Sequence, residues 1–170
     1  MLAGVVFMRD SKQVIPPISH DQRVRTLAAV NADYAHWVSV PTRWKDNDIY
    51  GHVNNVVHYS LMDTAINEWM IRTAGFEPGS AGVIGLCVES HCSYKAEVAF
   101  PDTIDLGLRI GRLGNSSVRW EAGLFRSDGT LVAEGHFVHV FVGREDRRPV
   151  PVPEAIRTEM LKLVRTGDTA

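Results

Sequence analysis

Cysteine is scarce in this chain, which has only Cys87 and Cys92 among its 170 residues. Both fall in one strand-like segment, where five residues of extended chain would separate them by about 16 Å, too far for a disulfide. Their odd spacing also predicts that they lie on opposite faces of the strand. We therefore expect two free thiols, packed as small apolar residues. The spacing of cysteine and histidine is not typical of zinc ligands, so we expect no metal site.

Long apolar runs and an excess of charge of one sign are also missing. No apolar segment approaches the roughly 18 residues that a membrane-spanning helix needs. The formal net charge of −2 offers no basic surface for nucleic acid or for an anionic membrane. The opening MLAGVVFM lacks the positive start of a signal peptide and is too short for one. We expect a cytoplasmic protein that binds neither nucleic acid nor membranes.

What remains is the composition of an ordinary globular protein, with 45% hydrophobic and 22% charged residues. A length of 170 residues suits one domain with a substantial core. We expect an N-terminal extension at residues 1–34, a main domain at residues 35–145, and a C-terminal part at residues 146–170. Three alternating prolines mark the start of that last part as a linker, and a short helix follows it.

Apolar residues recur with the period of a strand, then of a helix, then of four more strands. Residues 35–44 alternate as a strand does, and residues 56–74 repeat at helical spacing with an apolar surface broad enough for a covered helix. From residue 84 the period is two again. Turn residues separate the later strands: Phe100-Pro101-Asp102, Gly114-Asn115 and Ser127-Asp128-Gly129. One helix packed on one face of a five-stranded antiparallel sheet is the simplest α+β arrangement.

Two details of the strand pattern can be checked in a structure. Gly135 is on the face expected to meet the helix, where a missing side chain allows helix and sheet to approach closely. Strict alternation also predicts that six residues of one strand share a face. These six are Ile84, Leu86, Val88, Ser90, Cys92 and Tyr94.

The stretch richest in reactive groups is the polar loop before the expected helix, DNDIYGHVNN at residues 46–55. Backbone N–H groups are unpaired at a helix start, and the helix dipole favours negative charge there. Asp48 could act as a general base on water or attack a carbonyl carbon itself. The N–H groups of residues 54–56 could polarise that carbonyl.

His52 and Gly51 complete the candidate site in this loop. His52 could hydrogen-bond the Asp48 carboxylate, position water or stabilise charge, and Gly51 would let the backbone approach a ligand closely. Each residue also has an ordinary explanation: an acid before a helix is commonly a cap or a solvated charge, and a single histidine is more often structural. Asn54 and Asn55 are typical helix caps or turn residues. The chemical interpretation therefore depends on the cluster.

The segment TRWKDNDIYGHVNNVVHYSLMDTA resembles the signature of the hotdog-fold thioesterases of the 4-hydroxybenzoyl-CoA thioesterase type. That family carries roughly D-x-D-x-x-G-x-V in the loop, then an aromatic and an acidic residue along the helix. The residues that fit in order are Asp46, Asp48, Gly51, Val53, Tyr59 and Asp63. The likeness continues through the strands to about residue 142, and the PVPVPE tail is similar as well.

This resemblance implies a hotdog fold, in which a five-stranded antiparallel sheet wraps around a long central helix, here with a short C-terminal helix added. It implies hydrolysis of acyl-CoA to free acid and CoA without a cofactor. Asp48 would be the catalytic acid, the backbone N–H of Asn55 would polarise the thioester carbonyl, and His52 would assist. The residues expected to contact substrate are Gly51, Asn54, Tyr59 and Asp63. Sites of this family form between subunits, so a homodimer or homotetramer is implied.

There are three alternatives to acyl-CoA hydrolysis, and the sequence weakens some of them. GHVNN also resembles the D-x-N-x-H-V-N-N loop of plant acyl-carrier-protein thioesterases, but Tyr50 stands where those enzymes have a catalytic Asn. Hotdog hydratases carry D-x-N-P-x-H; here the interval from Asp to His is four residues and the proline is absent, which argues against hydration of an enoyl thioester. A non-catalytic acyl-CoA sensor on the same fold would have no need of Asp48. The sequence does not indicate which acyl group is cleaved.

Overall fold

The computed structural model describes residues 21–22, 26, 32–79 and 81–164. Most of the expected N-terminal extension and the end of the chain lie outside these described residues. The elements follow the predicted order. They are β1 (His36–Pro41), the 3-10 turn η1 (Trp44–Asp46), α2 (Asn55–Arg72), β2 (Val83–Tyr94), β3 (Thr103–Leu113), β4 (Ser117–Phe125), β5 (Leu131–Gly143) and α3 (Glu154–Leu161). The expected division into extension, main domain and C-terminal part stays a prediction.

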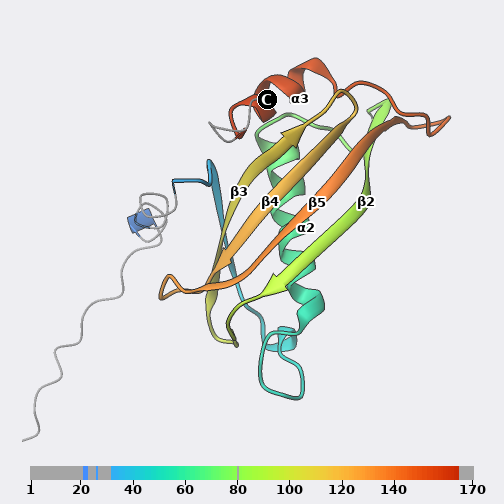
Figure 1. Cartoon of the computed structure of the whole chain (residues 1–170). Helices are drawn as coiled ribbons and strands as arrows, with labels where there is room; N and C mark the ends of the chain where they lie inside the picture. The colour runs from blue at the N-terminus through green and yellow to red at the C-terminus, as the bar shows by residue number, and fades with distance from the viewer. Residues whose placement is uncertain (1–20, 23–25, 27–31, 80, 165–170) are drawn as a thin grey trace, which may run out of the picture.

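The five strands form one antiparallel sheet in the order β1-β3-β4-β5-β2. The sheet curves around α2, which runs along one face, and α3 covers the end of the sheet near β3 (Figure 1). The backbone N–H of Ile110 donates to the carbonyl of Leu163 at 2.9 Å, which fastens the segment after α3 to β3. The predicted α+β hotdog fold, with its short C-terminal helix, is confirmed.

The core lies between α2 and the face of the sheet turned toward it, which we call the inner face. The helix contributes the buried residues Leu61, Met62, Ala65, Ile66, Trp69 and Met70. The alternating residues predicted for β3 and β4 are buried opposite them: Ile104, Leu106, Leu108, Ile110, Val118, Trp120, Ala122 and Leu124. Trp69 meets Trp120 edge-on, with ring centroids 5.2 Å apart. Each large apolar side chain contributes about 1.5–3 kcal/mol when fully buried, so this contact fixes the helix on the sheet.

β2 departs from the predicted alternation because it contains a β-bulge. Its register with β5 shifts between Cys87 and Glu89. One extra residue in a strand moves every later side chain to the other face. The predicted common face for six residues between 84 and 94 is therefore wrong, since the bulge divides the set.

The two cysteines show the consequence of the bulge. Cys87 pairs with His139 and Cys92 pairs with Gly135, and both partners lie on the inner face of β5. The expectation that the thiols lie on opposite faces is therefore wrong. The expectation that they are free is confirmed, and the expectation that both are packed is correct for Cys92, which is buried, and wrong for Cys87, which is exposed.

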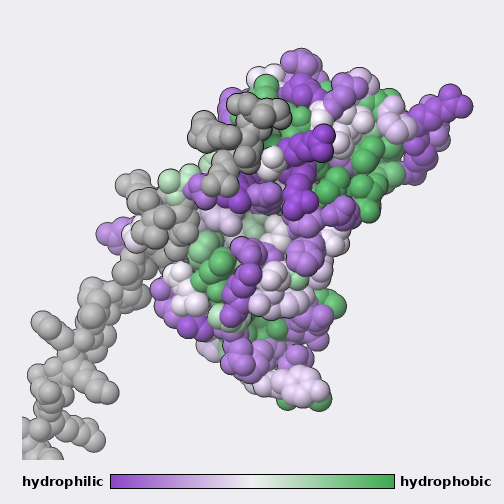
Figure 2. Space-filling view, viewed as in Figure 1, coloured by the Kyte–Doolittle hydropathy of each residue, from purple (hydrophilic) through white to green (hydrophobic). Residues whose placement is uncertain are grey.

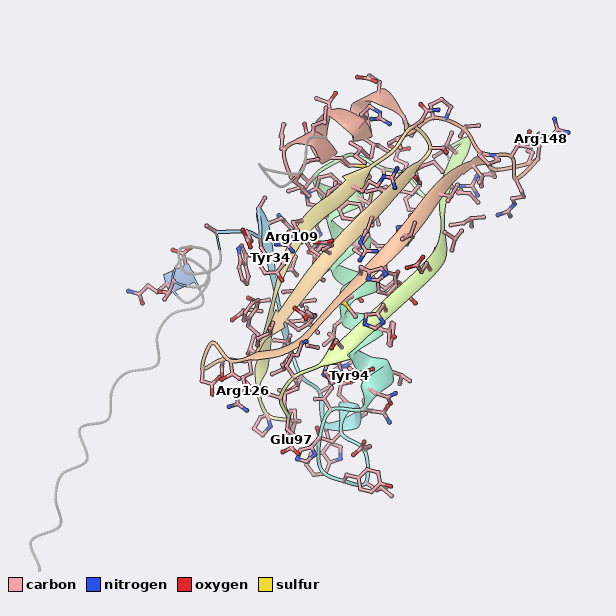
Figure 3. The ribbon with its side chains drawn as sticks, in the orientation of Figure 1. Tyr34, Tyr94, Glu97, Arg109, Arg126 and Arg148 are labelled. Carbon is pink, nitrogen blue, oxygen red and sulfur yellow. The ribbon has the colours of Figure 1, made fainter. Side chains whose placement is uncertain are left out.

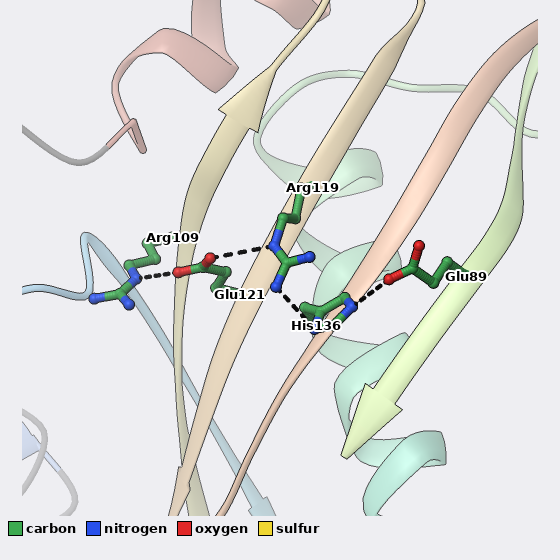
Figure 4. A network of polar contacts seen from close by, with 5 residues as sticks. All are labelled: Glu89, Arg109, Arg119, Glu121 and His136. Carbon is green, nitrogen blue, oxygen red and sulfur yellow. Dashed lines mark hydrogen bonds and ion pairs between the residues drawn. The ribbon is translucent and has the colours of Figure 1, made fainter. Parts of the chain in front are cut away.

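The outer face of the sheet carries a chain of polar contacts across four strands (Figure 4). Glu121 accepts hydrogen bonds from Arg109 (2.7 Å) and from Arg119 (3.3 Å). Arg119 also approaches Nδ1 of His136 at 3.0 Å, and Nε2 of that ring lies 2.7 Å from Glu89. Because arginine can only donate, Nδ1 is the acceptor and Nε2 carries the proton toward Glu89. The chain of contacts links edge strand β2 to the middle of the sheet.

Three histidines are removed from water to different degrees: His36 on β1 is half-buried, and His58 on α2 and His139 on β5 are buried. Burial lowers the pKa of each ring because it disfavours the charged imidazolium. The effect is opposed for His36 by the charge of Glu68 and for His139 by the charge of Asp63.

These histidines make stability depend on pH. Their folded-state pKa values lie below the value of about 6.5 for an unfolded histidine, so the unfolded chain binds more protons as the pH falls. We expect a steady free energy of unfolding above about pH 7 and a decline from about pH 6.5 to pH 5. The slope is at most about 1.4 kcal/mol per pH unit for each histidine. Urea unfolding at each pH measures it; His139→Phe should flatten the decline, and a flat profile for the parent would contradict the prediction.

Gly135 bears out the close approach of helix and sheet. A Cβ atom at this position would lie 2.9 Å from Sδ of Met62 on α2 and would collide with the backbone carbonyl oxygen of His91. Gly135→Ala should therefore lower the free energy of unfolding by about 1–3 kcal/mol, because the backbone cannot move aside without cost. Equilibrium urea unfolding measures this loss. Gly85→Ala, where nothing lies within 4 Å, is the control; equal losses in both variants would refute the explanation.

Candidate functional site

The loop before α2 is a small hairpin. Asn47 and Val53 pair across it as an isolated antiparallel bridge. Between them, the N–H of Asp48 donates to the carbonyl of His52 at 2.9 Å, and the N–H of Gly51 donates to the carbonyl of Asp48 at 3.1 Å. Gly51 has a φ of +88°, in the left-handed region that side chains rarely adopt. The turn itself thus requires Gly51, and its expected contact with substrate stays a prediction.

Asp46 fixes the base of this hairpin. Its buried carboxylate accepts hydrogen bonds from the backbone N–H of Arg43 at 2.7 Å and from Nε of the same residue at 3.0 Å. Its backbone carbonyl accepts from the N–H of Asn54 at 2.8 Å. Burial raises the pKa of the Asp46 carboxyl, but the hydrogen bonds and charge of Arg43 outweigh it and hold that pKa below its usual value. Asp46 therefore positions the loop.

Asp48 is half-buried on the hairpin, beside a hollow of about 420 Å³ that Trp44 and Ile49 also line. One carboxylate oxygen accepts a hydrogen bond from the backbone N–H of Tyr50 at 2.8 Å, which forms an Asx turn. The other oxygen has no hydrogen-bond partner within the described part of the chain. Asp48 thus combines a fixed orientation with one oxygen free to react.

His52 is directed away from Asp48 in this structure. Its Nε2 lies 3.2 Å from the carboxylate of Glu97, which is labelled in Figure 3 below the end of β2. The expected hydrogen bond from His52 to the Asp48 carboxylate is therefore not formed. The other two expected roles, positioning water and stabilising charge, stay predictions.

The start of α2 is capped by asparagine as predicted. Oδ1 of Asn54 accepts a hydrogen bond from the N–H of Val56 at 3.1 Å, and the carbonyl of Asn54 accepts from the N–H of Val57 at 2.9 Å. The backbone N–H of Asn55 has no acceptor among the described residues. This is the donor that the sequence predicted would polarise a carbonyl, and it is left available at the positive end of the helix.

Asn55, Tyr59 and Asp63 recur every four residues and therefore form one stripe of α2. The hydroxyl of Tyr94, at the end of β2, donates to the carbonyl of Asn55 at 3.2 Å (Figure 3). Tyr59 meets Phe137 of β5 edge-on, with ring centroids 6.1 Å apart. The structure thus aligns these predicted site residues beside β2 and β5, in the direction that leads away from the hairpin.

One buried residue of this region was not predicted to have a role. His58 donates from Nδ1 to the carbonyl of Asn54, the residue that caps α2, at 3.2 Å. Its position shares the helical spacing of Leu61, Met62 and Ala65, so the sequence pattern assigns it to the apolar stripe. The hydrogen bond depends on how the helix begins, and periodicity does not show it.

No group of three or more histidine, cysteine, aspartate or glutamate side chains in the described ranges of the chain could hold a metal ion. Within the same ranges, none of the helices combines the length and apolarity of a membrane span.

The chain matches the model of the Thioesterase-like superfamily over residues 42–160. It is 48% identical to the PA5185 protein of Pseudomonas aeruginosa strain PAO1, with a TM-score of 0.77 and coverage of 79% of this chain and 95% of that one. It is 33% identical to the PA2801 protein of Pseudomonas aeruginosa, a candidate thioesterase, with a TM-score of 0.69 and coverage of 74% and 97%.

A more distant structure shares the fold alone. The gentisyl-coenzyme A thioesterase BH1999 is 23% identical, with a TM-score of 0.66 and coverage of 74% of this chain and 99% of that one. A search of curated proteins found no match. Because the family model spans more than half of the sequence and two solved relatives exceed 30% identity over about three quarters of it, the chain belongs to the Thioesterase-like superfamily.

Proposed function

We propose that the protein hydrolyses acyl-CoA to free acid and CoA, with Asp48 as general base or nucleophile. The observation that carries the proposal is the place of Asp48, held by an Asx turn beside a hollow, on the hairpin that leads into α2. The unpaired N–H of Asn55 at that helix start, within the part of the chain described, supplies the complementary donor. Membership of the Thioesterase-like superfamily supports the same reaction.

Hydrolysis requires oxygen at the carbonyl carbon and stabilisation of the charge that grows on the carbonyl oxygen. The free oxygen of Asp48 can take a proton from water, or it can attack the carbon and form an anhydride. The N–H of Asn55 donates to the developing oxyanion, helped by the dipole of α2. The bond from carbon to sulfur then breaks and CoA leaves as a thiolate. Neither route calls for a cofactor.

Each of the remaining predicted residues has a proposed role in this reaction. His52, half-buried and paired with Glu97, is available to position water. Gly51 and Asn54 flank the carbonyl at the hairpin and the helix cap. From Asn55 to Asp63 the helix advances eight residues, or about 12 Å, so Tyr59 and Asp63 would line the acyl group over that length. Those two positions give a starting point for altering acyl preference.

Replacement of the proposed base tests this function. Asp48→Asn keeps an acceptor for the Tyr50 N–H but removes the carboxylate, so kcat should fall at least 100-fold. The measurement is thiol release from a panel of short, long, branched and aromatic acyl-CoAs. Asp128→Asn is the matched control, because Asp128 forms the same kind of turn with the N–H of Thr130 at 2.9 Å. That variant should keep parental rates.

Two outcomes would contradict the proposal that Asp48 catalyses thioester hydrolysis. If Asp48→Asn releases thiol as fast as the parent, the carboxylate has no chemical role. A parent that binds acyl-CoA without releasing thiol would instead be a non-catalytic binder. Faster release from a matched acyl-carrier-protein substrate would assign the same chemistry to a different carrier.

We also infer that a second copy of the chain completes the site. β2 ends the sheet and pairs only with β5 among the described strands. Leu86 and Val88 on this edge strand are 37% and 62% exposed, and Figure 2 shows hydrophobic surface along the edge. An open edge strand of this length is a template for pairing with another strand. Pairing along β2 would place the second copy beside the stripe of α2 that carries Tyr59.

A charge on the edge strand tests this assembly. Val88→Lys should convert the parental homodimer or homotetramer to monomers, because paired edges would bring lysines together in a desolvated contact. Light scattering after size-exclusion chromatography measures the mass, and thiol release should fall in the same variant. Leu161→Lys, on α3 and 58% exposed, is the control and should change neither. A monomeric parent, or an unchanged mass for Val88→Lys, would contradict the inference.

A further inference from the structure

His58 is a buried titratable residue that the proposed reaction leaves without a role. It lies in the first turn of α2 and is 5% exposed. Its Nδ1 is 3.2 Å from the carbonyl oxygen of Asn54, and because a carbonyl can only accept, Nδ1 carries the proton. The ring also meets Tyr94 edge-on, with centroids 5.2 Å apart. Packing and hydrogen bonding together hold the imidazole in one orientation.

The carbonyl that His58 contacts and the proposed oxyanion donor are two ends of one peptide group. The carbonyl belongs to Asn54 and the N–H to Asn55, and resonance across the C–N bond couples them. A hydrogen bond accepted by the oxygen draws electron density from the nitrogen and makes its N–H a stronger donor, by about 10–30% per bond. The Asn54 oxygen accepts such bonds from the His58 ring and from the N–H of Val57 at 2.9 Å, in addition to the first backbone bond of the helix.

We infer that His58 is a positioning residue for thioester hydrolysis: its Nδ1–H orients and polarises the peptide group between Asn54 and Asn55, whose N–H stabilises the oxyanion. This role rests on the proposed function and extends it to a side chain that never touches the substrate. The imidazole suits the task because Nδ1 branches close to the backbone, where it reaches a carbonyl four residues earlier in the same turn.

Tyr94 offers a matched comparison within the same turn. Its hydroxyl donates to the carbonyl of Asn55 at 3.2 Å, one peptide group further along. The N–H of that next group belongs to Val56 and is already bonded to Oδ1 of Asn54 at 3.1 Å. Tyr94→Phe therefore removes one hydrogen bond from the helix start without weakening the Asn55 N–H as a donor. If the role of His58 were purely structural, loss of the His58 donor and loss of the Tyr94 donor should change kcat by similar amounts.

The kinetic test compares three variants in the thiol-release assay. His58→Phe keeps a ring but removes the donor, and we expect kcat to fall about 3- to 10-fold with KM changed less than twofold. This loss is smaller than the 10²- to 10³-fold cost of removing an oxyanion donor outright. His58→Asn restores an N–H near the Nδ1 position and should recover most of the rate. Tyr94→Phe should stay within twofold of the parent.

A second measurement needs no substrate. In a ¹H–¹⁵N spectrum of the full chain, the Asn55 amide proton should move upfield in His58→Phe and return in His58→Asn. Fraying of the helix start would move the Val56 and Val57 resonances equally, and that result would overturn the inference. His58→Leu is a second donor-free variant in case the phenylalanine is not accommodated.

The experiments distinguish failure of the proposed thioester hydrolysis from failure of the proposed role of His58. A parent without thiol release would end the proposed function, although the amide shift would still report on the polarised peptide group. An active parent whose kcat is unchanged in His58→Phe, or whose Asn55 resonance does not move, would end the role of His58 and leave thioester hydrolysis intact.

Discussion

The packing of α2 against the inner face of the sheet is the contact on which the rest of the structure depends. Neither partner can bury its apolar surface alone, since the helix carries a broad buried stripe and β3 and β4 turn every second residue toward it. The missing side chain of Gly135 lets Met62 reach the sheet. Because the hairpin runs directly into α2, the same contact determines where Asp48 and Asn55 lie.

Features that are encoded within a few residues could be predicted from the sequence, and features that depend on a distant partner could not. The strand and helix periods, the Asn54 cap and the turn at Gly129 are local, and all appear in the structure. The bulge in β2 is not local, because its register is defined only against β5. A period-two pattern cannot show a skipped residue, so the faces assigned beyond Val88 came out reversed.

The candidate site likewise has some features that follow from local sequence and others that depend on distant partners. The motif located Asp48 and the free N–H of Asn55 because both follow from the order of residues at a loop and a helix start. The partners of the remaining side chains are set in three dimensions: His52 meets Glu97, forty-five residues away, and Asp46 is committed to Arg43. His58 was hidden by its regular spacing, since a histidine in an apolar stripe looks like a core residue until its acceptor is seen.

Polar groups on the inner face gather where the core is open. Asp63 on α2 lies close enough to His139 on β5 and to Cys87 on β2 to act electrostatically on both, and all three lie toward the exposed edge. Deeper in the core, β3 and β4 contribute only apolar side chains to this face. A covering strand from the same chain would bury the exposed Asp63 and Cys87 and block access along α2. Because β2 stays at the edge of the sheet, that side of α2 is open both to the proposed pairing with a second copy and to the proposed substrate.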